Sequence, residues 1–198
     1  MVTYRRRIHE VLRYLLETYP NAVLVGQSIR DPYGGACKVT RGLTKQFGDR
    51  ILDTPISEAM MVGVANGLAL KGYIPIVEIM FSDFMTLTVD QIVNVAGKMW
   101  EHHKKDHRII IRTMQCDDRM YGPTHCQDMS WLLKAIPHAC LHDLDLKTNV
   151  KQVYEAIING GAATASSGND ESDWSEPVHI IREYKNLYDI QCESDITQ

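Results

Sequence analysis

Residues 54–81 read TPISEAMMVGVANGLALKGYIPIVEIMF, a helical pattern followed at once by a short apolar run. Thr54 is a residue type that caps helices, and Pro55 suits the first helical position. Gly72 suits the residue that follows a helix. The run at 74–81 is apolar almost throughout, which is typical of a strand covered on both faces of a sheet. This stretch therefore predicts one helix–strand unit of an α/β fold.

The same alternation of helical patterns and apolar runs extends along the chain. Strand-like runs lie at 22–26, 74–81, 108–112, 138–144 and 177–183. Helical patterns lie at 5–18, 54–72, 86–103, 128–136 and 149–165. A polar loop fills 27–50. This alternation predicts a three-layer α/β/α domain with a mainly parallel sheet over residues 1–188. Residues 189–198 are expected to form a loose tail.

Composition excludes several classes of protein. The chain has 198 residues, a formal net charge of −4 and 44% hydrophobic residues, so a packed core without a basic face is expected. We therefore predict no nucleic-acid partner. Apolar runs stay short of the ~20 residues of a membrane span, so no membrane association is expected. The five cysteines form no Cys-x-x-Cys pair, which favours a reducing, cytoplasmic setting and no metal site.

Three side chains are expected to meet at one edge of the sheet. Glu58 follows the loop after the first predicted strand, Phe84 follows the second, and His125 follows the third. Functional sites of parallel sheets form at the carboxyl ends of the strands. Each residue also has a simpler interpretation. Glu58 could merely interact with the helix dipole, and His125 could be a structural loop residue.

The helix after Glu58 contains two interior glycines. Gly63 and Gly67 each cost up to about 1 kcal/mol relative to alanine in a helix. Such a slim helix indicates close approach of another backbone, so we expect the chain to self-associate across it. No GxGxxG or GxxxxGK[ST] phosphate-binding signature is present. An unrelated nucleotide-binding module would need such a loop.

Three stretches together resemble one family. They are GGACKVTRGLTKQFGDRILDTPISEAMMVGVANGLALKGYIPIVEIMFSDF at 34–84, DQIVN at 90–94 and YGPTHCQ at 121–127. In this order the chain is similar to the β subunit of thiamine-diphosphate-dependent 2-oxo-acid dehydrogenases. The same pyrimidine-binding domain recurs in transketolase-like enzymes. The resemblance covers roughly residues 22–140.

The resemblance implies a catalytic role for Glu58. The family's glutamate contacts a ring nitrogen of the cofactor pyrimidine, and its proton promotes the imino form of the aminopyrimidine. The imino nitrogen then removes a proton from the thiazolium carbon, which leaves a carbanion. That carbanion attacks the carbonyl of a 2-oxo acid or a ketose. Decarboxylation, oxidative decarboxylation or ketol transfer would follow.

The resemblance also implies the surroundings of the cofactor. Phe84 is expected to stack on the pyrimidine, with Met80 lining the same region. Gln27 stands where the family commonly has a cofactor-region glutamate. His125 matches a histidine that donates a proton or hydrogen bond near the reacting carbonyl. Arg112 matches an arginine at a strand end in the substrate region.

The resemblance implies a partner chain. The Gly-Asp-Gly and Asn-Asn motifs that hold the diphosphate and Mg²⁺ in this family are absent here. We therefore expect an α-type subunit to supply them, in an α2β2 assembly. We also expect the family's usual C-terminal domain to be absent from this chain. The alternative is a non-catalytic or regulatory relative that binds a partner without turnover.

Overall fold

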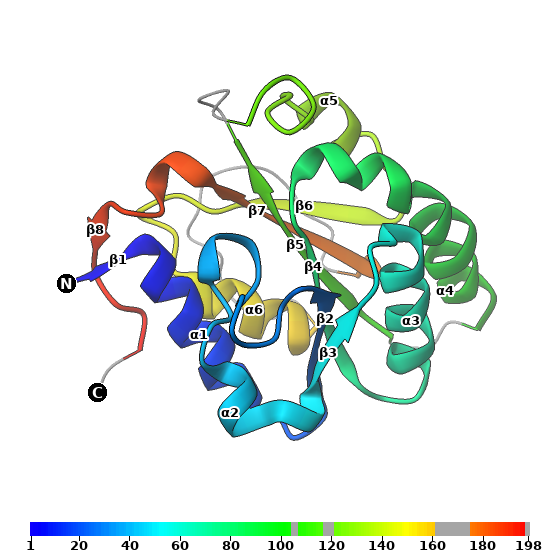
Figure 1. The fold of residues 1–198 in the computed structure, drawn as a ribbon. Helices are drawn as coiled ribbons and strands as arrows, with labels where there is room; N and C mark the ends of the chain where they lie inside the picture. Colours follow the sequence, from blue (N-terminus) through cyan, green and yellow to red (C-terminus); the bar gives the residue numbers. More distant parts are fainter. Residues whose placement is uncertain (104–106, 117–120, 161–174, 197–198) are drawn as a thin grey trace.

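The computed structural model describes residues 1–103, 107–116, 121–160 and 175–196 (Figure 1). Its centre is a six-stranded sheet in which all neighbouring strands run parallel. In spatial order the strands are β3 (Ile51–Thr54), β2 (Ala22–Gln27), β4 (Ile74–Ile79), β5 (Ile109–Gln115), β7 (Val178–Tyr184) and β6 (Ala139–Asp143). The prediction of a mainly parallel sheet is confirmed.

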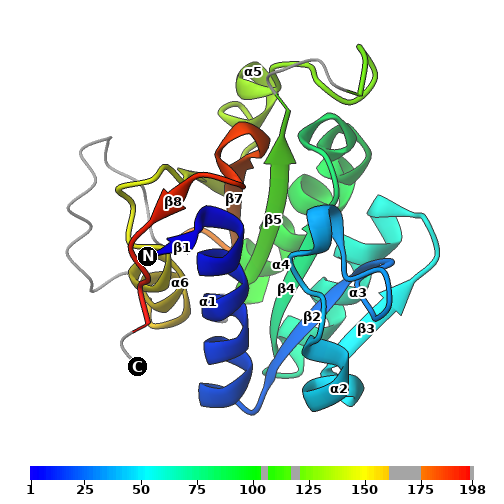
Figure 2. The same cartoon turned by 60° about the vertical axis from the view of Figure 1, so that its left-hand side comes forward.

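Helices cover both faces of this sheet (Figure 1). On one face α1 (Tyr4–Thr18) and α6 (Val150–Ile158) lie side by side, as Figure 2 also shows. The other face carries α3 (Glu58–Leu70), a π-helical segment (Gln91–Gly97) and α4 (Lys98–His103). The short helices are α2 (Leu43–Phe47) and α5 (Ser130–Leu133). Two apolar cores result, one on each side of the sheet, so the three-layer prediction is confirmed.

The predicted start of the second long helix is wrong. Thr54 is the last residue of β3, where it pairs with Gln27. The helix begins at Glu58, and its cap is Ser57, whose hydroxyl accepts a hydrogen bond from the Met60 amide. The predicted 86–103 helix is also divided, into a 3-10 segment (Ser82–Thr88), the π-helical segment and α4.

The expectation of a loose tail is wrong for residues 189–196. Here β8 (Gln191–Cys192) pairs antiparallel with β1 (Val2–Thr3). The Asp195 carboxylate accepts a hydrogen bond from the Val150 amide at 2.7 Å, at the start of α6. The two ends of the chain therefore close onto each other. Within the predicted 149–165 helix, α6 ends at Ile158, and residues 161–165 lie outside the described residues.

None of the helices in the described ranges combines the length and the apolar composition that crossing a membrane requires.

Candidate functional site

Parallel strands bring their carboxyl ends to one edge of the sheet. Gln27 ends β2 and Thr54 ends β3, and the two residues are paired. Within the described part of the chain, Gln27 Oε1 and Thr54 Oγ1 are buried and have no hydrogen-bond partner. Buried polar groups are normally satisfied. This edge therefore suits a polar ligand or ordered water.

Glu58 starts α3 at the same edge. Its side chain is only 6% exposed. Among the described residues, its carboxylate has no hydrogen-bond or ion-pair partner. The Glu58 oxygens do not belong to the fully buried atoms without a partner, so they keep contact with solvent and are open to a ligand at this edge. Glu58 is also the first residue of α3, so the simpler interpretation, a favourable interaction with the helix dipole, applies to it as well.

His125 sits in an aromatic cluster with Phe84, Phe81 and Tyr121. The His125 ring centroid lies 4.9 Å from that of Phe81 and 5.2 Å from that of Phe84, both edge-on. Phe81 also contacts Phe84 at 5.9 Å and Tyr121 at 5.3 Å. The structure thus brings two of the predicted residues, His125 and Phe84, into direct contact. Sequence reasoning missed Phe81, although it ends the apolar run before Phe84.

The loop that carries His125 is held by polar side chains from β5 and from the start of the 3-10 segment. Asp83 Oδ1 accepts hydrogen bonds from the Gln127 backbone amide at 3.1 Å and from Gln127 Nε2 at 3.0 Å. Gln115 Nε2 donates to the Gln127 carbonyl at 2.5 Å, and Ser82 Oγ donates to Gln115 Oε1 at 2.8 Å. Asp83 and Gln115 therefore hold the loop at Gln127, two residues after His125, and sequence reasoning missed both. Asp83 within FSDF was the available signal.

Arg112 does not join this site. It is 3% exposed, and its Nε and Nη2 donate to the two carboxylate oxygens of Glu183 at 2.9 and 2.6 Å. Its Nη1 donates to Glu78 Oε2. Tyr188 Oη adds a hydrogen bond to Glu183 at 2.5 Å. Because Nε, Nη1 and Nη2 of Arg112 all donate to these two glutamates, the guanidinium connects β4, β5 and β7. It does not point to the candidate site, where the predicted substrate role would require it.

Glu78 links this buried network to the polar loop. Its Oε1 accepts a hydrogen bond from the Ala36 amide at 2.5 Å. Gly35 has φ +73°, and a Cβ there would lie 2.7 Å from the same oxygen, so a side chain is excluded. Burial raises the pKa of Glu78, although Arg112 opposes the shift, and the neighbouring carboxylates raise the pKa of Arg112. The network thus fixes the loop over the end of β4.

Met80 and α3, the helix that contains Gly63 and Gly67, lie in different parts of the structure. Met80 is half-buried beside β4 and packs on the core under α1. A Cβ on Gly63 would lie 3.2 Å from Gln91 Oε1 of the same chain, so this glycine serves a contact within the subunit. Gly67 is exposed and faces open space. Only Gly67 is therefore placed for the predicted contact with another subunit.

The carboxyl edge thus combines an acid without a side-chain partner among the described residues, an unsatisfied amide oxygen, and an imidazole among aromatic rings. An acid can exchange a proton with a ring nitrogen, an aromatic ring can stack on a planar heterocycle, and an imidazole can donate to a carbonyl. These features define a parallel-sheet α/β domain whose candidate site lies at the carboxyl ends of its strands.

The chain belongs to the transketolase pyrimidine-binding domain family, which its sequence matches over residues 1–160. This confirms the resemblance to the pyrimidine-binding domain of β subunits and transketolase-like enzymes.

Named relatives agree with this membership. The chain is 36% identical to the acetoin:2,6-dichlorophenolindophenol oxidoreductase subunit beta of Cupriavidus necator over 200 residues, 94% of this chain and 54% of that protein. It is 43% identical to the pyruvate dehydrogenase E1 component subunit beta of Leifsonia xyli over 93 residues, 46% of this chain and 27% of that protein. The chain thus spans about half or less of these relatives.

A solved structure supports the fold. It is a split-gene transketolase described as an inactive beta4 tetramer, and it superposes with a TM-score of 0.61 at 19% sequence identity. The superposition covers 93% of this chain and 52% of that chain.

Proposed function

We propose that this chain is the pyrimidine-binding subunit of a two-chain thiamine-diphosphate-dependent enzyme that acts on a 2-oxo acid or a ketose. The observation that carries the proposal is Glu58, a buried carboxylate without a partner among the described residues. Family membership and the names of the relatives support the same assignment. When bound, the cofactor would supply a carbanion that attacks the substrate carbonyl.

Four residues of this chain would receive the pyrimidine end of the cofactor. Glu58 would hold a proton at a pyrimidine ring nitrogen. Phe84 would stack on the ring, and Met80 would line the adjacent wall. Gln27 Oε1 would accept a hydrogen bond in place of the partner that it lacks within the described residues.

His125 would act on the substrate side. Its Nδ1 lies 2.7 Å from Thr124 Oγ1 in the same loop. The edge-on contacts with Phe81 and Phe84 fix the ring plane. From this position the imidazole would donate a proton or hydrogen bond near the reacting carbonyl.

The diphosphate and Mg²⁺ would be held by an α-type subunit carrying Gly-Asp-Gly and Asn-Asn. The outer side of α3 supports contact with another subunit. Met60 and Val64 are exposed apolar residues four positions apart on α3, Gly67 follows them, and the exposed Ile56 lies just before the helix begins. Apolar side chains repeated along one helix side mark an interaction surface. We propose an α2β2 assembly built around this surface.

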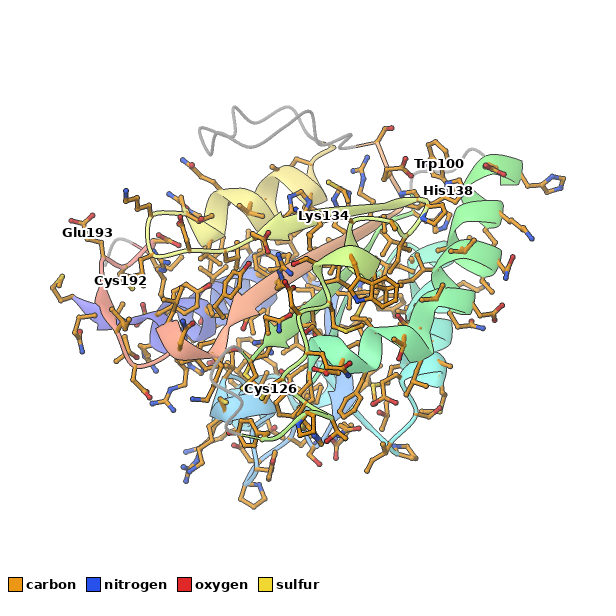
Figure 3. The ribbon with its side chains drawn as sticks, turned by 90° about the horizontal axis from the view of Figure 1, so that it is seen from above. Trp100, Cys126, Lys134, His138, Cys192 and Glu193 are labelled. Atoms are coloured by element: carbon orange, nitrogen blue, oxygen red, sulfur yellow. The ribbon has the colours of Figure 1, made fainter. Side chains whose placement is uncertain are left out.

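The test compares Glu58→Gln with Glu193→Gln in complex with the α-type subunit. Glu193 is an exposed glutamate far from Cys126, which neighbours His125, so it is a matched control (Figure 3). The expected result is a fall in kcat of about 10²-fold or more for Glu58→Gln, because positioned acid–base groups contribute about 10²–10⁴-fold. Glu193→Gln should keep the wild-type rate. Calorimetry with thiamine diphosphate and Mg²⁺ measures whether binding needs both chains.

Unchanged turnover in Glu58→Gln would refute the assigned role. A complex that binds the α-type subunit and the cofactor without any turnover would instead support the alternative, a regulatory relative. Cofactor binding by this chain alone, at full affinity, would contradict the two-chain site.

A further inference from the structure

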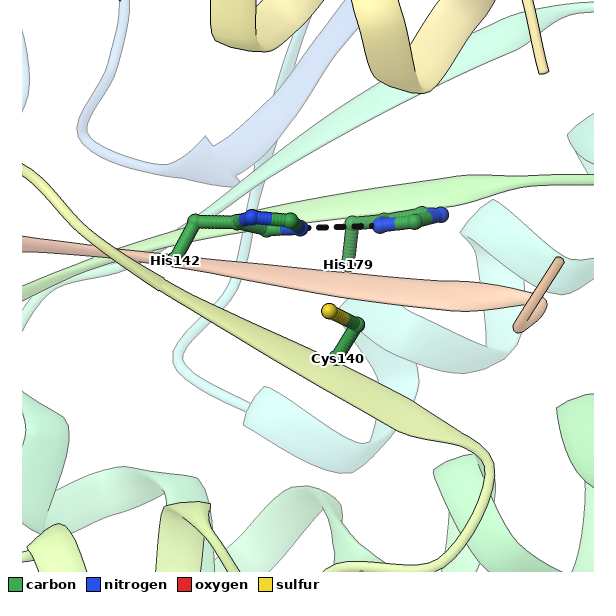
Figure 4. A group of neighbouring side chains, drawn as sticks. All are labelled: Cys140, His142 and His179. Carbon is green, nitrogen blue, oxygen red and sulfur yellow. Dashed lines mark hydrogen bonds between the residues drawn. The ribbon is translucent and has the colours of Figure 1, made fainter. Parts of the chain in front are cut away.

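A second cluster of functional side chains lies away from the carboxyl edge. Cys140 and His142 alternate on β6, so both side chains point to the same face of the sheet. His179 of β7 is the direct neighbour of Cys140 in the parallel pairing. Figure 4 shows the two imidazoles next to each other with the Cys140 sulfur beside them. The two strands thus bring one thiol and two imidazoles together.

The three side chains form a compact set of ligand atoms. Cys140 Sγ and one nitrogen from each histidine all lie within 4.8 Å of one another. His142 Nε2 and His179 Nδ1 are 3.0 Å apart. Tetrahedral zinc, with Zn–S about 2.3 Å and Zn–N about 2.1 Å, needs ligand atoms about 3.3–3.6 Å apart. A side-chain shift of roughly 1 Å therefore admits an ion.

We propose that Cys140, His142 and His179 form a zinc-binding site. One thiolate and two imidazoles are ligands that zinc favours, whereas Ca²⁺ and Mg²⁺ require oxygen ligands. All three side chains are at most 9% exposed, so a bound ion is shielded from competing ligands. The fourth position is left to a water molecule.

Metal binding changes the protonation of the ligand side chains. The Cys140 thiol releases its proton to solvent, and the resulting thiolate coordinates the ion. The hydrogen bond between the two histidines is replaced by two metal–nitrogen bonds. One of the two hydrogen-bonded nitrogens carries an N–H before binding, so that imidazole changes tautomer by proton exchange with solvent. Each neutral imidazole then has its one N–H on the ring nitrogen that does not coordinate.

This site is independent of the proposed function. Cys140 and His179 each occupy the second position of their strands, so they lie toward the amino ends. The candidate active site lies at the carboxyl ends. A zinc ion here would fasten the edge strand β6 to β7, a role in stability that does not require turnover. Failure of one proposal therefore leaves the other untouched.

The test uses the purified protein, stripped with a chelator and then titrated with Co²⁺ as a spectroscopic probe. One equivalent of Co²⁺ should give a thiolate-to-cobalt charge-transfer band and tetrahedral d–d bands, and Zn²⁺ should displace it. Cys140→Ser should lose the charge-transfer band. His142→Asn should weaken Co²⁺ binding by about 10-fold or more.

Cys192→Ser is the matched control and should behave like wild type. Cys192 is as buried as Cys140 but lies on β8. Figure 3 shows it well apart from His138, which is two residues before Cys140, and from Cys126. Absence of a thiolate band in the wild-type protein would overturn the proposal, as would a band that survives in Cys140→Ser. If Cys140→Ser does not fold, X-ray absorption spectroscopy of the zinc-loaded wild-type protein identifies the ligand atoms of the zinc instead. One sulfur and two imidazoles in the first shell are expected, and any other set refutes the site.

Discussion

Replacing Arg112 by methionine removes the only cation that contacts two buried carboxylates in the described part of the chain. Glu78 and Glu183 are 5% and 0% exposed, and both receive hydrogen bonds from this guanidinium. Methionine keeps most of the length of the side chain. The substitution therefore tests the charge, with little change in packed volume.

The expected loss of stability follows from proton uptake. Without the guanidinium, a buried glutamate avoids its charge by binding a proton. From an ordinary pKa of about 4.3, this costs about 3.7 kcal/mol at pH 7, at 1.36 kcal/mol per unit. One proton shared by the pair thus costs about 4 kcal/mol, and two protons cost about 7 kcal/mol. Total stabilities of domains are about 5–15 kcal/mol, so the variant is near its unfolding limit at neutral pH.

The sign of the pH dependence distinguishes this cause from a packing defect. The pKa of the carboxyls in the folded variant is raised above the unfolded value, so their protonation favours folding at low pH. Their contribution is lost as pH rises. At pH 5 each proton costs only about 1 kcal/mol, so Arg112→Met should recover most of its stability there.

The assay is urea unfolding followed by circular dichroism, between pH 5 and pH 7.5. The gap in unfolding free energy between wild type and variant should widen by about 1.4–2.8 kcal/mol per pH unit. Adding Glu78→Gln and Glu183→Gln to Arg112→Met is the control, and it should remove the pH dependence. A gap that is independent of pH, or smaller than about 1 kcal/mol at pH 7, would refute the reasoning.

Two further predictions concern single side chains. Asp83→Ala removes the acceptor of both Gln127 hydrogen bonds, so unfolding free energy should fall by about 2–4 kcal/mol and kcat should fall because His125 loses its support. Urea unfolding and turnover measure these effects, and a kcat equal to wild type would contradict the positioning role. Burial lowers the pKa of His142 to about 4, so in chelator-treated protein proton uptake by this histidine favours the unfolded state as pH falls below 6.5. About 3 kcal/mol should be lost between pH 6.5 and 4, and an acid unfolding curve unchanged in His142→Gln would argue against it.

The strongly periodic elements could be predicted from the sequence. The 5–18 prediction corresponds to α1, where Ile8, Leu12 and Leu15 are buried at helical spacing. The strands of the sheet centre are covered on both faces, so their apolar runs stand out. These patterns depend only on residues near each other in the chain, so the sequence alone predicts these helices and strands.

Other elements depend on partners distant in the chain. The strand β3 has four residues and no clear pattern, and it forms by pairing with β2. The pair β1 and β8 joins opposite ends of the chain. The π-helical segment ends at Gly97, where a Cβ would collide with the His138 ring. No local pattern predicts such contacts.

The residues of the candidate site also fall into those that local sequence predicts and those that depend on contacts between distant parts of the chain. Parallel topology predicts Glu58, Phe84 and His125 at one edge, because each follows a strand end, and of these three the structure shows Phe84 and His125 in contact. The role of Arg112 was not predictable, since Glu183 lies 71 residues further along the chain. The zinc cluster needed the β6–β7 register to bring His179 beside Cys140.

The buried ion network gives the candidate site its rigid support. Buried ion pairs add little net stability compared with apolar packing, so their value here lies in positioning. Glu78 holds the Ala36 amide of the polar loop, and Arg112 joins Glu78 to Glu183 across three strands. The strand that carries Glu78 leads directly to Met80 and Phe84, and the strand that carries Arg112 leads to Gln115. The charges therefore fix the strand ends from which the site is built, which functional sites require.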